Sequence, residues 1–198
     1  EGLNGRYFGE DGNPIRRRIA RDDFGTNPCS EIILRSREFC NLSECVVRRD
    51  DTREHLKEKV RVATILGTFQ STLTEFKYLS REWKRNCEEE RLLGVSLTGI
   101  MDNPLTNGSK KGLDKLLEEL RDVAYETNKE WAEKLGIPPS AAITCVKPSG
   151  TVSQLVDSAS GIHARHNPFY IRTVRADNKD PLCNLMKERE GGRGKGRG

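Results

Sequence analysis

The sequence predicts an α/β fold in which short strands alternate with long helices. Two amphipathic segments, residues 52–80 and 112–135, alternate with short apolar runs at 94–100 and 141–146. A strand–helix–strand–helix order with connections of this length favours parallel strands, because each helix returns the chain to the starting end of the sheet. The 198 residues suffice for one domain or a little more.

The first long helix is expected at 52–80. Asp51 as N-cap, with Glu54 three residues later, is a typical helix start. Apolar residues then recur at spacings of three and four, which places them on one face of a helix. That face consists of Leu56, Val60, Ala63, Leu66, Phe69, Leu73, Phe76 and Leu79. The helical pattern resumes from Trp83 to Leu93.

The next elements follow from alternation and from turn residues. Residues 94–100 alternate small or polar with apolar side chains, which indicates a buried strand that ends in a turn at 103–104. A second amphipathic helix covers 112–135 and is closed by Gly136. Residues 141–146 form a short β-like run, which is followed by a loop and a further helical pattern.

The two ends of the chain differ in composition from its middle. Residues 1–26 are rich in Gly and turn residues, so we expect a loop with little regular structure. The last eight residues, GGRGKGRG, are too polar to bury a core and are expected to be disordered. This divides the chain into a domain at 1–190 and a tail at 191–198. The tail carries three of the net +4 charges, so the body is near neutral and no specific nucleic-acid binding is expected.

Composition excludes several classes of protein. Hydrophobic residues make up 34% of the chain, and no run approaches the roughly 20 apolar residues of a membrane span. We therefore expect no membrane partner. The chain opens at Glu1 without Met and without a secretory leader, which suggests a cytoplasmic location and a piece of a longer protein. The six cysteines form no C-x-x-C pair and no zinc spacing, so reduced thiols and no metal site are expected.

One short segment, GTNPCSEI, combines an amide, a thiol and a carboxylate at alternate positions. Pro28 favours an extended backbone before it, and alternate side chains of an extended segment share a face. Asn27, Cys29 and Glu31 would then point into one pocket. Cys40 follows at a spacing that fits no metal site but allows a loop to bring both thiols together. Taken alone, two packed thiols remain the simpler interpretation.

A second segment is typical of a phosphate-binding turn. Lys147-Pro148-Ser149-Gly150-Thr151-Val152-Ser153 follows a strand and stands where a helix begins. Unpaired N–H groups at such a position suit a phosphate. The segment lacks the Gly-Lys-Ser/Thr ending of a Walker A motif. An ordinary capped helix start is an equally good interpretation of the spacing alone.

Five blocks together resemble the monomeric, adenosylcobalamin-dependent ribonucleoside-triphosphate reductases, which are class II ribonucleotide reductases. The blocks are GTNPCSEI, EFCNLSE, GTFQSTLTEFKYL, NCEEERLLGVSLTGIMDNPL and KPSGTVSQLVDSASGIHARHNPFYIRTVR. They occur in this order between Gly25 and Leu185. Their joint occurrence is far more specific than any one of them.

The resemblance implies a fold, a cofactor and roles for individual residues. The fold is part of a ten-stranded α/β barrel with a central finger loop that carries the radical cysteine, which is Cys29 by motif. With adenosylcobalamin, this cysteine becomes a thiyl radical that abstracts the substrate 3′ hydrogen. Glu31 acts as general base, Asn27 binds the ribose hydroxyls, and Cys40 is one of two reducing thiols. Residues 148–153 hold the substrate phosphates.

The resemblance also implies partners and leaves alternatives. The substrate is a ribonucleoside triphosphate that is reduced to a deoxyribonucleotide for DNA synthesis, and a thioredoxin-like protein restores the thiols. The partner of Cys40 is expected in a missing reductase segment, because Cys45, Cys87, Cys145 and Cys183 lie in no matching motif. The alternatives are a truncated, non-catalytic fragment that binds nucleotide or a partner chain, and an Arg/Gly-tailed nucleic-acid binder.

Overall fold

The computed structural model describes residues 6–8, 14–16, 23–171, 173 and 175–193. The chain divides into two compact units, Glu1–Arg165 and His166–Gly198. The first unit holds the sheet and the long helices, and the second holds a single described helix.

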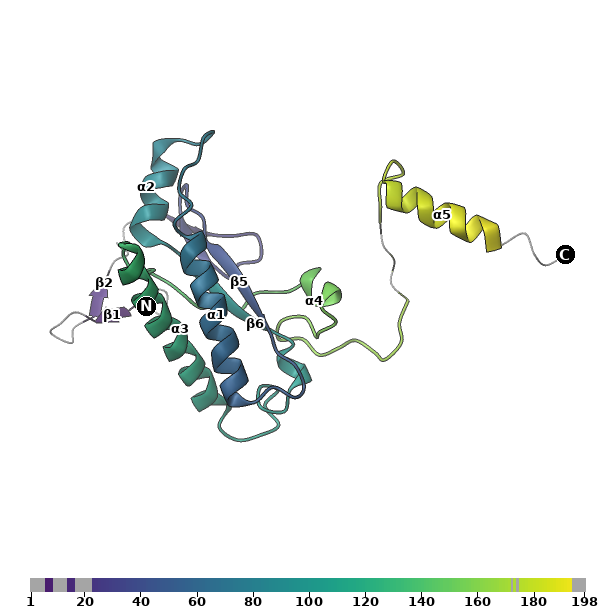
Figure 1. Ribbon diagram of the computed structural model, residues 1–198, viewed down its shortest axis with the longest axis horizontal. Helices are drawn as coiled ribbons and strands as arrows, with labels where there is room; N and C mark the ends of the chain where they lie inside the picture. Colours follow the sequence, from purple (N-terminus) through teal and green to yellow (C-terminus); the bar gives the residue numbers. More distant parts are fainter. Residues whose placement is uncertain (1–5, 9–13, 17–22, 172, 174, 194–198) are drawn as a thin grey trace. The chain divides into compact units, whose positions relative to one another are not determined.

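A small parallel sheet forms the centre of the first unit. β5 (Asn41–Val46) pairs in parallel with β6 (Leu93–Thr98), and Thr144 bridges in parallel to Val95 on the other side of β6. Helices α1 (Arg53–Gln70) and α3 (Leu113–Leu135) pack against each other beside these strands (Figure 1). The predicted α/β class with parallel strands is therefore confirmed, whereas the ten-stranded barrel stays a prediction.

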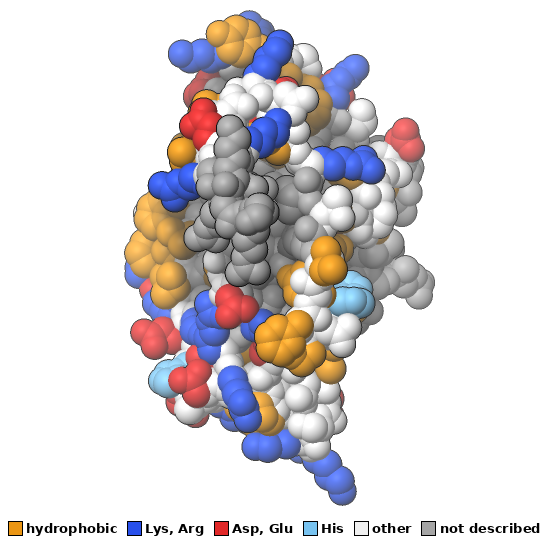
Figure 2. All heavy atoms as spheres, turned by 90° about the vertical axis from the view of Figure 1, so that its right-hand side faces the viewer, with side chains coloured by type: hydrophobic (Ala, Val, Ile, Leu, Met, Phe, Trp, Pro, Cys, Tyr) orange, Lys and Arg blue, Asp and Glu red, His pale blue; other side chains and the backbone are white. Residues whose placement is uncertain are grey.

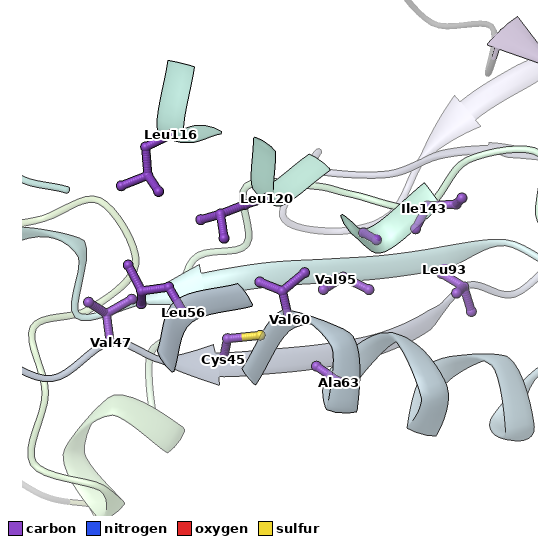
Figure 3. Packing of buried hydrophobic residues seen from close by; sticks show 11 residues of the cluster. Cys45, Val47, Leu56, Val60, Ala63, Leu93, Val95, Leu116, Leu120 and Ile143 are labelled. Carbon is purple, nitrogen blue, oxygen red and sulfur yellow. The ribbon is translucent and has the colours of Figure 1, made fainter. Parts of the chain in front are cut away.

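The core lies between this sheet and the two helices. Figure 3 shows Leu116 and Leu120 of α3 and Leu56, Val60 and Ala63 of α1 gathered around the apolar side chains of β5 and β6. The buried cluster consists of Cys45, Val47, Leu56, Val60, Ala63, Leu93, Val95, Leu116, Leu120, Ala124 and Ile143. The first three positions of the predicted apolar face of α1 are thus buried. Leu66, the fourth, is 62% exposed.

α1 begins one residue later than its predicted cap. Thr52 is the N-cap, and its Oγ1 accepts a hydrogen bond of 3.2 Å from the backbone N–H of His55. The carboxylate of Asp51 instead accepts hydrogen bonds from the backbone N–H of Arg48 and from Lys59. The predicted cap was therefore wrong, because Asp51 is engaged by the loop before the helix and by a side chain of its second turn.

α1 also ends at Gln70, well before the predicted residue 80. The Ser71 hydroxyl turns back and donates to the Thr68 carbonyl at 2.7 Å. The Arg91 guanidinium donates to the Ser71 carbonyl at 2.6 Å. Since this carbonyl is satisfied by a distant side chain, the helix stops although the apolar spacing continues through Leu73, which is 72% exposed.

The remaining boundaries are close to the predicted ones. α2 (Arg81–Glu90) ends where Arg91 adopts a left-handed φ of 47°, so Leu93 begins β6 instead of closing a helix. α3 begins at Leu113, after a left-handed Gly112 that was expected inside the helix, and it ends at the left-handed Gly136, as the sequence predicts. The β-like run at 141–146 contributes the single bridge at Thr144.

The N-terminal segment contains strands that were not predicted. β1 (Arg6–Phe8) pairs antiparallel with β2 (Pro14–Arg16), and β3 (Phe24–Thr26) pairs antiparallel with β4 (Ile33–Arg35). The expectation of a loop over residues 1–26 was wrong for these strands. They have three residues each, which is too short for alternation to reveal them. The rest of that segment before Asp23 lies outside the described residues.

Shorter elements complete the chain. The 3₁₀ helix η1 (Ile100–Asp102) follows β6, and α4 (Val152–Leu155) begins within the predicted phosphate loop at 148–153. In the second unit, α5 (Pro181–Arg193) continues into the segment that was expected to be a disordered tail. The remaining tail residues lie outside the described residues. Within the described parts of the chain, no helix has the length and apolar character needed to cross a bilayer.

Candidate active site

Cys29 lies in the turn of the β3–β4 hairpin. The Ser30 N–H donates to the Asn27 carbonyl at 2.9 Å, and the Asn27 N–H donates to the Ile32 carbonyl at 3.2 Å. The Asn27 side-chain oxygen accepts from the Ile32 N–H at 3.1 Å. The predicted extended backbone over 27–31 was therefore wrong, because Pro28 and Ser30, with its φ of 62°, form a turn. Cys29 is exposed at this turn.

Glu31 is the buried carboxylate of the hairpin. Its side chain is 1% exposed, and its Oε1 lies 2.9 Å from the ammonium group of Lys147. Burial alone would raise the pKa of Glu31. The ammonium group of Lys147, the backbone N–H of Glu31 itself and the Asn27 amide outweigh that effect and lower the pKa below its usual value. Glu31 is thus held as a carboxylate beside the amide of Asn27.

Lys147 was not among the predicted site residues. Besides its ion pair with Glu31, its ammonium group also interacts with the Cys29 side chain. These interactions raise the pKa of Lys147, the contact with Glu31 most of all. The signal in the sequence was its place directly before Pro148, at the entrance of the predicted phosphate loop.

Cys40 lies next to this group, directly before β5. It is half-buried, and burial raises the pKa of its thiol, followed by the negative charge of Glu31. Lys147 acts on the same thiol in the opposite direction. The structure therefore brings all four predicted residues together: Asn27, Cys29, Glu31 and Cys40.

Cys145 is a second thiol near Cys40. Both residues pack against the buried cluster of Ile32, Leu92 and Ala141. Burial and the nearby Glu31 raise the pKa of Cys145 to about 12. β5 and residue 144 pair with opposite sides of β6, so their backbones are about 10 Å apart at the usual strand spacing. A disulfide requires Cα atoms closer than about 7 Å, so this pair does not form one without a backbone movement.

The predicted phosphate loop is tied together by its own hydroxyl groups. The Ser149 hydroxyl accepts from the Ser153 N–H at 3.1 Å, and the Ser153 hydroxyl donates to the Ser149 carbonyl at 2.6 Å. The Ser160 hydroxyl donates to the same carbonyl. Both loop serines are buried, at 3% and 0% exposure, so their side chains shape the loop from inside.

The outer side of this loop presents backbone donors. Gly150, Thr151 and Val152 are exposed, and within the described residues their N–H groups donate no hydrogen bond. These three consecutive N–H groups lie at the start of α4, where unpaired donors can bind an anion. These residues begin three positions after Lys147, whose side chain contacts Glu31 beside the Cys29 turn.

On the one face that Figure 2 shows, Lys and Arg side chains are interspersed with acidic and apolar ones. Several large apolar side chains are almost fully exposed, including Leu155 at 86% in the first unit and Phe169 at 93% in the second.

The comparisons with known proteins find relatives of one kind among curated sequences. No family model matches the chain. An adenosylcobalamin-dependent ribonucleoside-triphosphate reductase of Euglena gracilis is 32% identical over 162 residues, which cover 82% of this chain and 22% of that protein. The enzyme of the same name from Lactobacillus acidophilus is 29% identical over 195 residues, which cover 86% of this chain and 26% of that protein.

A solved structure agrees with these relatives. The crystal structure of a B12-dependent, class II ribonucleotide reductase matches with a TM-score of 0.63 and 26% identity over 81% of this chain and 25% of that chain. The chain thus spans about a quarter of the length of the proteins that it matches. From these similarities in sequence and in structure, the chain is homologous to a portion of the adenosylcobalamin-dependent, class II ribonucleotide reductases.

Proposed function

We propose that this chain supplies the radical cysteine and the phosphate loop of a class II ribonucleotide reductase. The reaction converts a ribonucleoside triphosphate and two thiols into a 2′-deoxyribonucleotide, water and a disulfide. The proposal is supported by the contacts of Lys147. Its side chain interacts with Cys29 and with the buried carboxylate of Glu31, and it precedes the backbone donors of residues 150–152 in the chain.

Cys29 is the proposed hydrogen-abstracting residue. Its exposed position in a tight turn fits a sulfur that must be reached by both a large cofactor and a sugar. Adenosylcobalamin, when bound, supplies the radical that takes the hydrogen atom from this sulfur. The resulting thiyl radical removes the 3′ hydrogen of the ribose and returns a hydrogen at the end of the reaction, since S–H and ribose C–H bonds are close in strength.

Glu31 and Asn27 are the proposed acid–base pair of residues. A carboxylate that is kept ionised can accept the proton of the 3′-hydroxyl group, which assists loss of the 2′-hydroxyl as water. The Asn27 oxygen is engaged by the Ile32 N–H, so its amide NH₂ group is the part that can reach ribose oxygens. The turn that exposes Cys29 thus also orients the groups on either side of it.

Cys40 is the proposed source of reducing electrons. Burial and Glu31 raise its pKa, which keeps it a protonated thiol at neutral pH. A thiol in that state can donate a proton to the leaving 2′-hydroxyl and then be oxidised to a disulfide. Its partner thiol belongs to a reductase segment outside this chain, and a thioredoxin-like protein restores the pair.

The loop at 148–153 is the proposed site of the substrate phosphates. Backbone N–H groups bind phosphate oxygens without contacting the base of the nucleotide. In this proposal, Lys147 lies between the loop that holds the phosphates and the turn that faces the ribose. The missing segment of the barrel is the proposed partner that encloses it.

The test is to restore the missing barrel segment by co-expression with the remainder of a relative, and to supply adenosylcobalamin and ribonucleoside triphosphates. Deoxynucleotide formation is expected, and Cys29→Ala should abolish it. Cys183→Ala is the matched control, because Cys183 lies in the second unit. An assembled complex that binds nucleotide but forms no deoxynucleotide would instead support the second candidate.

That second candidate is a non-catalytic fragment that binds nucleotide or a partner chain. It is favoured by the length of the chain, which covers about a quarter of the relatives. In that case Cys29→Ala leaves the binding of a radiolabelled triphosphate unchanged. The substitution Thr151→Pro removes a backbone N–H donor and weakens that binding.

A further inference from the structure

We infer that Lys147 is a positioning residue that holds Glu31 and Cys29 in one orientation and sets the pH range over which Glu31 can accept a proton. The inference rests on the proposed function and deepens it. It concerns how a buried carboxylate is kept ready to act, and which residue of the phosphate loop region does so.

The geometry of Lys147 fits this role. Its ammonium group lies 2.9 Å from a carboxylate whose side chain is 1% exposed, and it also interacts with Cys29. The Lys147 side chain itself is 24% exposed, so one end of the ion pair still reaches solvent. An isolated buried carboxylate would be strongly disfavoured, and an ammonium group at this distance compensates for that burial.

The backbone of Lys147 packs closely against Gly161. A Cβ atom added at Gly161 would lie 2.9 Å from the Lys147 carbonyl oxygen, so only glycine allows this close approach. Gly161 in turn donates to the Thr98 hydroxyl at 2.8 Å, and Thr98 is fully buried at the end of β6. The sheet therefore determines where the Lys147 side chain starts, which is the property expected of a residue that orients others.

The other groups that face Glu31 do not carry a compensating charge. Asn27 contributes a neutral amide, and Cys40 and Cys145 are thiols whose pKa values are raised by burial. Without Lys147, burial would dominate and raise the pKa of Glu31. The carboxyl group would then stay protonated to higher pH and would be unable to act as a base there.

The first test measures the ionisation of Glu31 without any activity. The chain is labelled with ¹³C at glutamate side chains, and the Glu31 signal is assigned by its loss in Glu31→Gln. Lys147→Met is expected to move the titration midpoint of Glu31 to higher pH, and Lys147→Arg should restore it. Lys134→Met is the matched control, because Lys134 pairs with Glu130 on α3. An unchanged midpoint in Lys147→Met overturns the inference.

The second test uses the completed reductase. Lys147→Met should lower kcat/KM about tenfold or more near pH 6, and the loss should shrink as the pH rises and Glu31 ionises. A loss of the same size at every pH means a purely structural role and overturns the inference. If the wild-type complex forms no deoxynucleotide, the proposed function fails, while the titration of Glu31 still decides the role of Lys147.

Discussion

The buried carboxyl groups of Glu38 and Glu90 are hydrogen-bonded to each other, and Arg35 contacts both of them. Their side chains are 0% and 2% exposed. Burial raises the pKa of Glu38 to about 8, and the charge of Glu90 adds to that effect. The backbone N–H of Arg35 donates to the Glu38 carboxyl group at 2.8 Å, and the Arg35 guanidinium donates to the Asn86 carbonyl of α2. These contacts fix β4, and with it the Cys29 hairpin, against α2.

This pair predicts a stability that falls as the pH rises. The pKa of Glu38 is about 8 in the folded chain, above the ordinary value of 4.5 that it has when unfolded. Well below pH 4.5 the Glu38 carboxyl group is protonated in both the folded and the unfolded chain, and its contribution to stability is complete. That contribution is lost as the pH rises through about 8, where the folded chain releases the proton. The free energy of unfolding, measured with urea, should fall between these values.

Glu38→Gln should remove most of that pH dependence, because the amide keeps a hydrogen-bond donor without a titrating proton. Glu118→Gln, at an exposed position of α3, serves as the control and should retain the wild-type profile. Parallel profiles for wild type and Glu38→Gln would show that the pair is not the titrating group.

Gly99→Ala should destabilise the first unit more than Gly108→Ala. Both glycines have positive φ values, 76° and 81°, so both substitutions carry the same backbone strain. A Cβ at Gly99 would also lie 2.5 Å from the Val47 carbonyl oxygen, whereas Gly108 faces open space. We expect a difference of about 1–3 kcal/mol in the free energy of unfolding. Equal losses in the two variants would refute the close contact.

Leu56→Ala should cost about 2–5 kcal/mol of stability, since it leaves a cavity in the core. Leu56 is 0% exposed and belongs to the cluster between the helices and the sheet. Leu66→Ala on the same helix is the control, because that residue is 62% exposed and its loss should change stability by less than about 0.5 kcal/mol. Urea unfolding monitored by circular dichroism measures both, and a small loss for Leu56→Ala would contradict the packing of α1.

Cys40 and Cys145 should remain unlinked when the chain is oxidised with diamide. Their backbones lie on opposite sides of β6, which is too wide for a disulfide without rearrangement. Peptide mapping by mass spectrometry should show no peptide that joins the two residues within one chain. Detection of that peptide would identify Cys145 as the redox partner of Cys40 and would remove the need for a thiol from another segment.

Apolar spacing and turn residues predicted those helix faces and helix ends that depend on residues close together in the sequence. The spacing of Leu56, Val60 and Ala63 located the buried face of α1, and Gly136 marked the end of α3. The end of α1 could not be predicted in this way. The apolar spacing runs past Ser71, and the group that stops the helix is the distant guanidinium of Arg91.

The candidate site was predicted in part for the same reason. The short motif around Cys29 named Asn27 and Glu31, and the structure brings them together, but in a turn rather than on an extended strand. Lys147 was missed because its partner Glu31 is far away in the sequence. An ion pair between distant segments leaves no periodic signal, and only the folded sheet and loop reveal it.

The outer side of β5 has a consequence for handling the protein. Among the described residues, β6 is the strand that pairs with β5, so one row of backbone donors and acceptors remains without a neighbouring strand. Such a row can be extended by the same row of another molecule. When produced without the rest of a reductase, the chain should therefore form oligomers as its concentration rises.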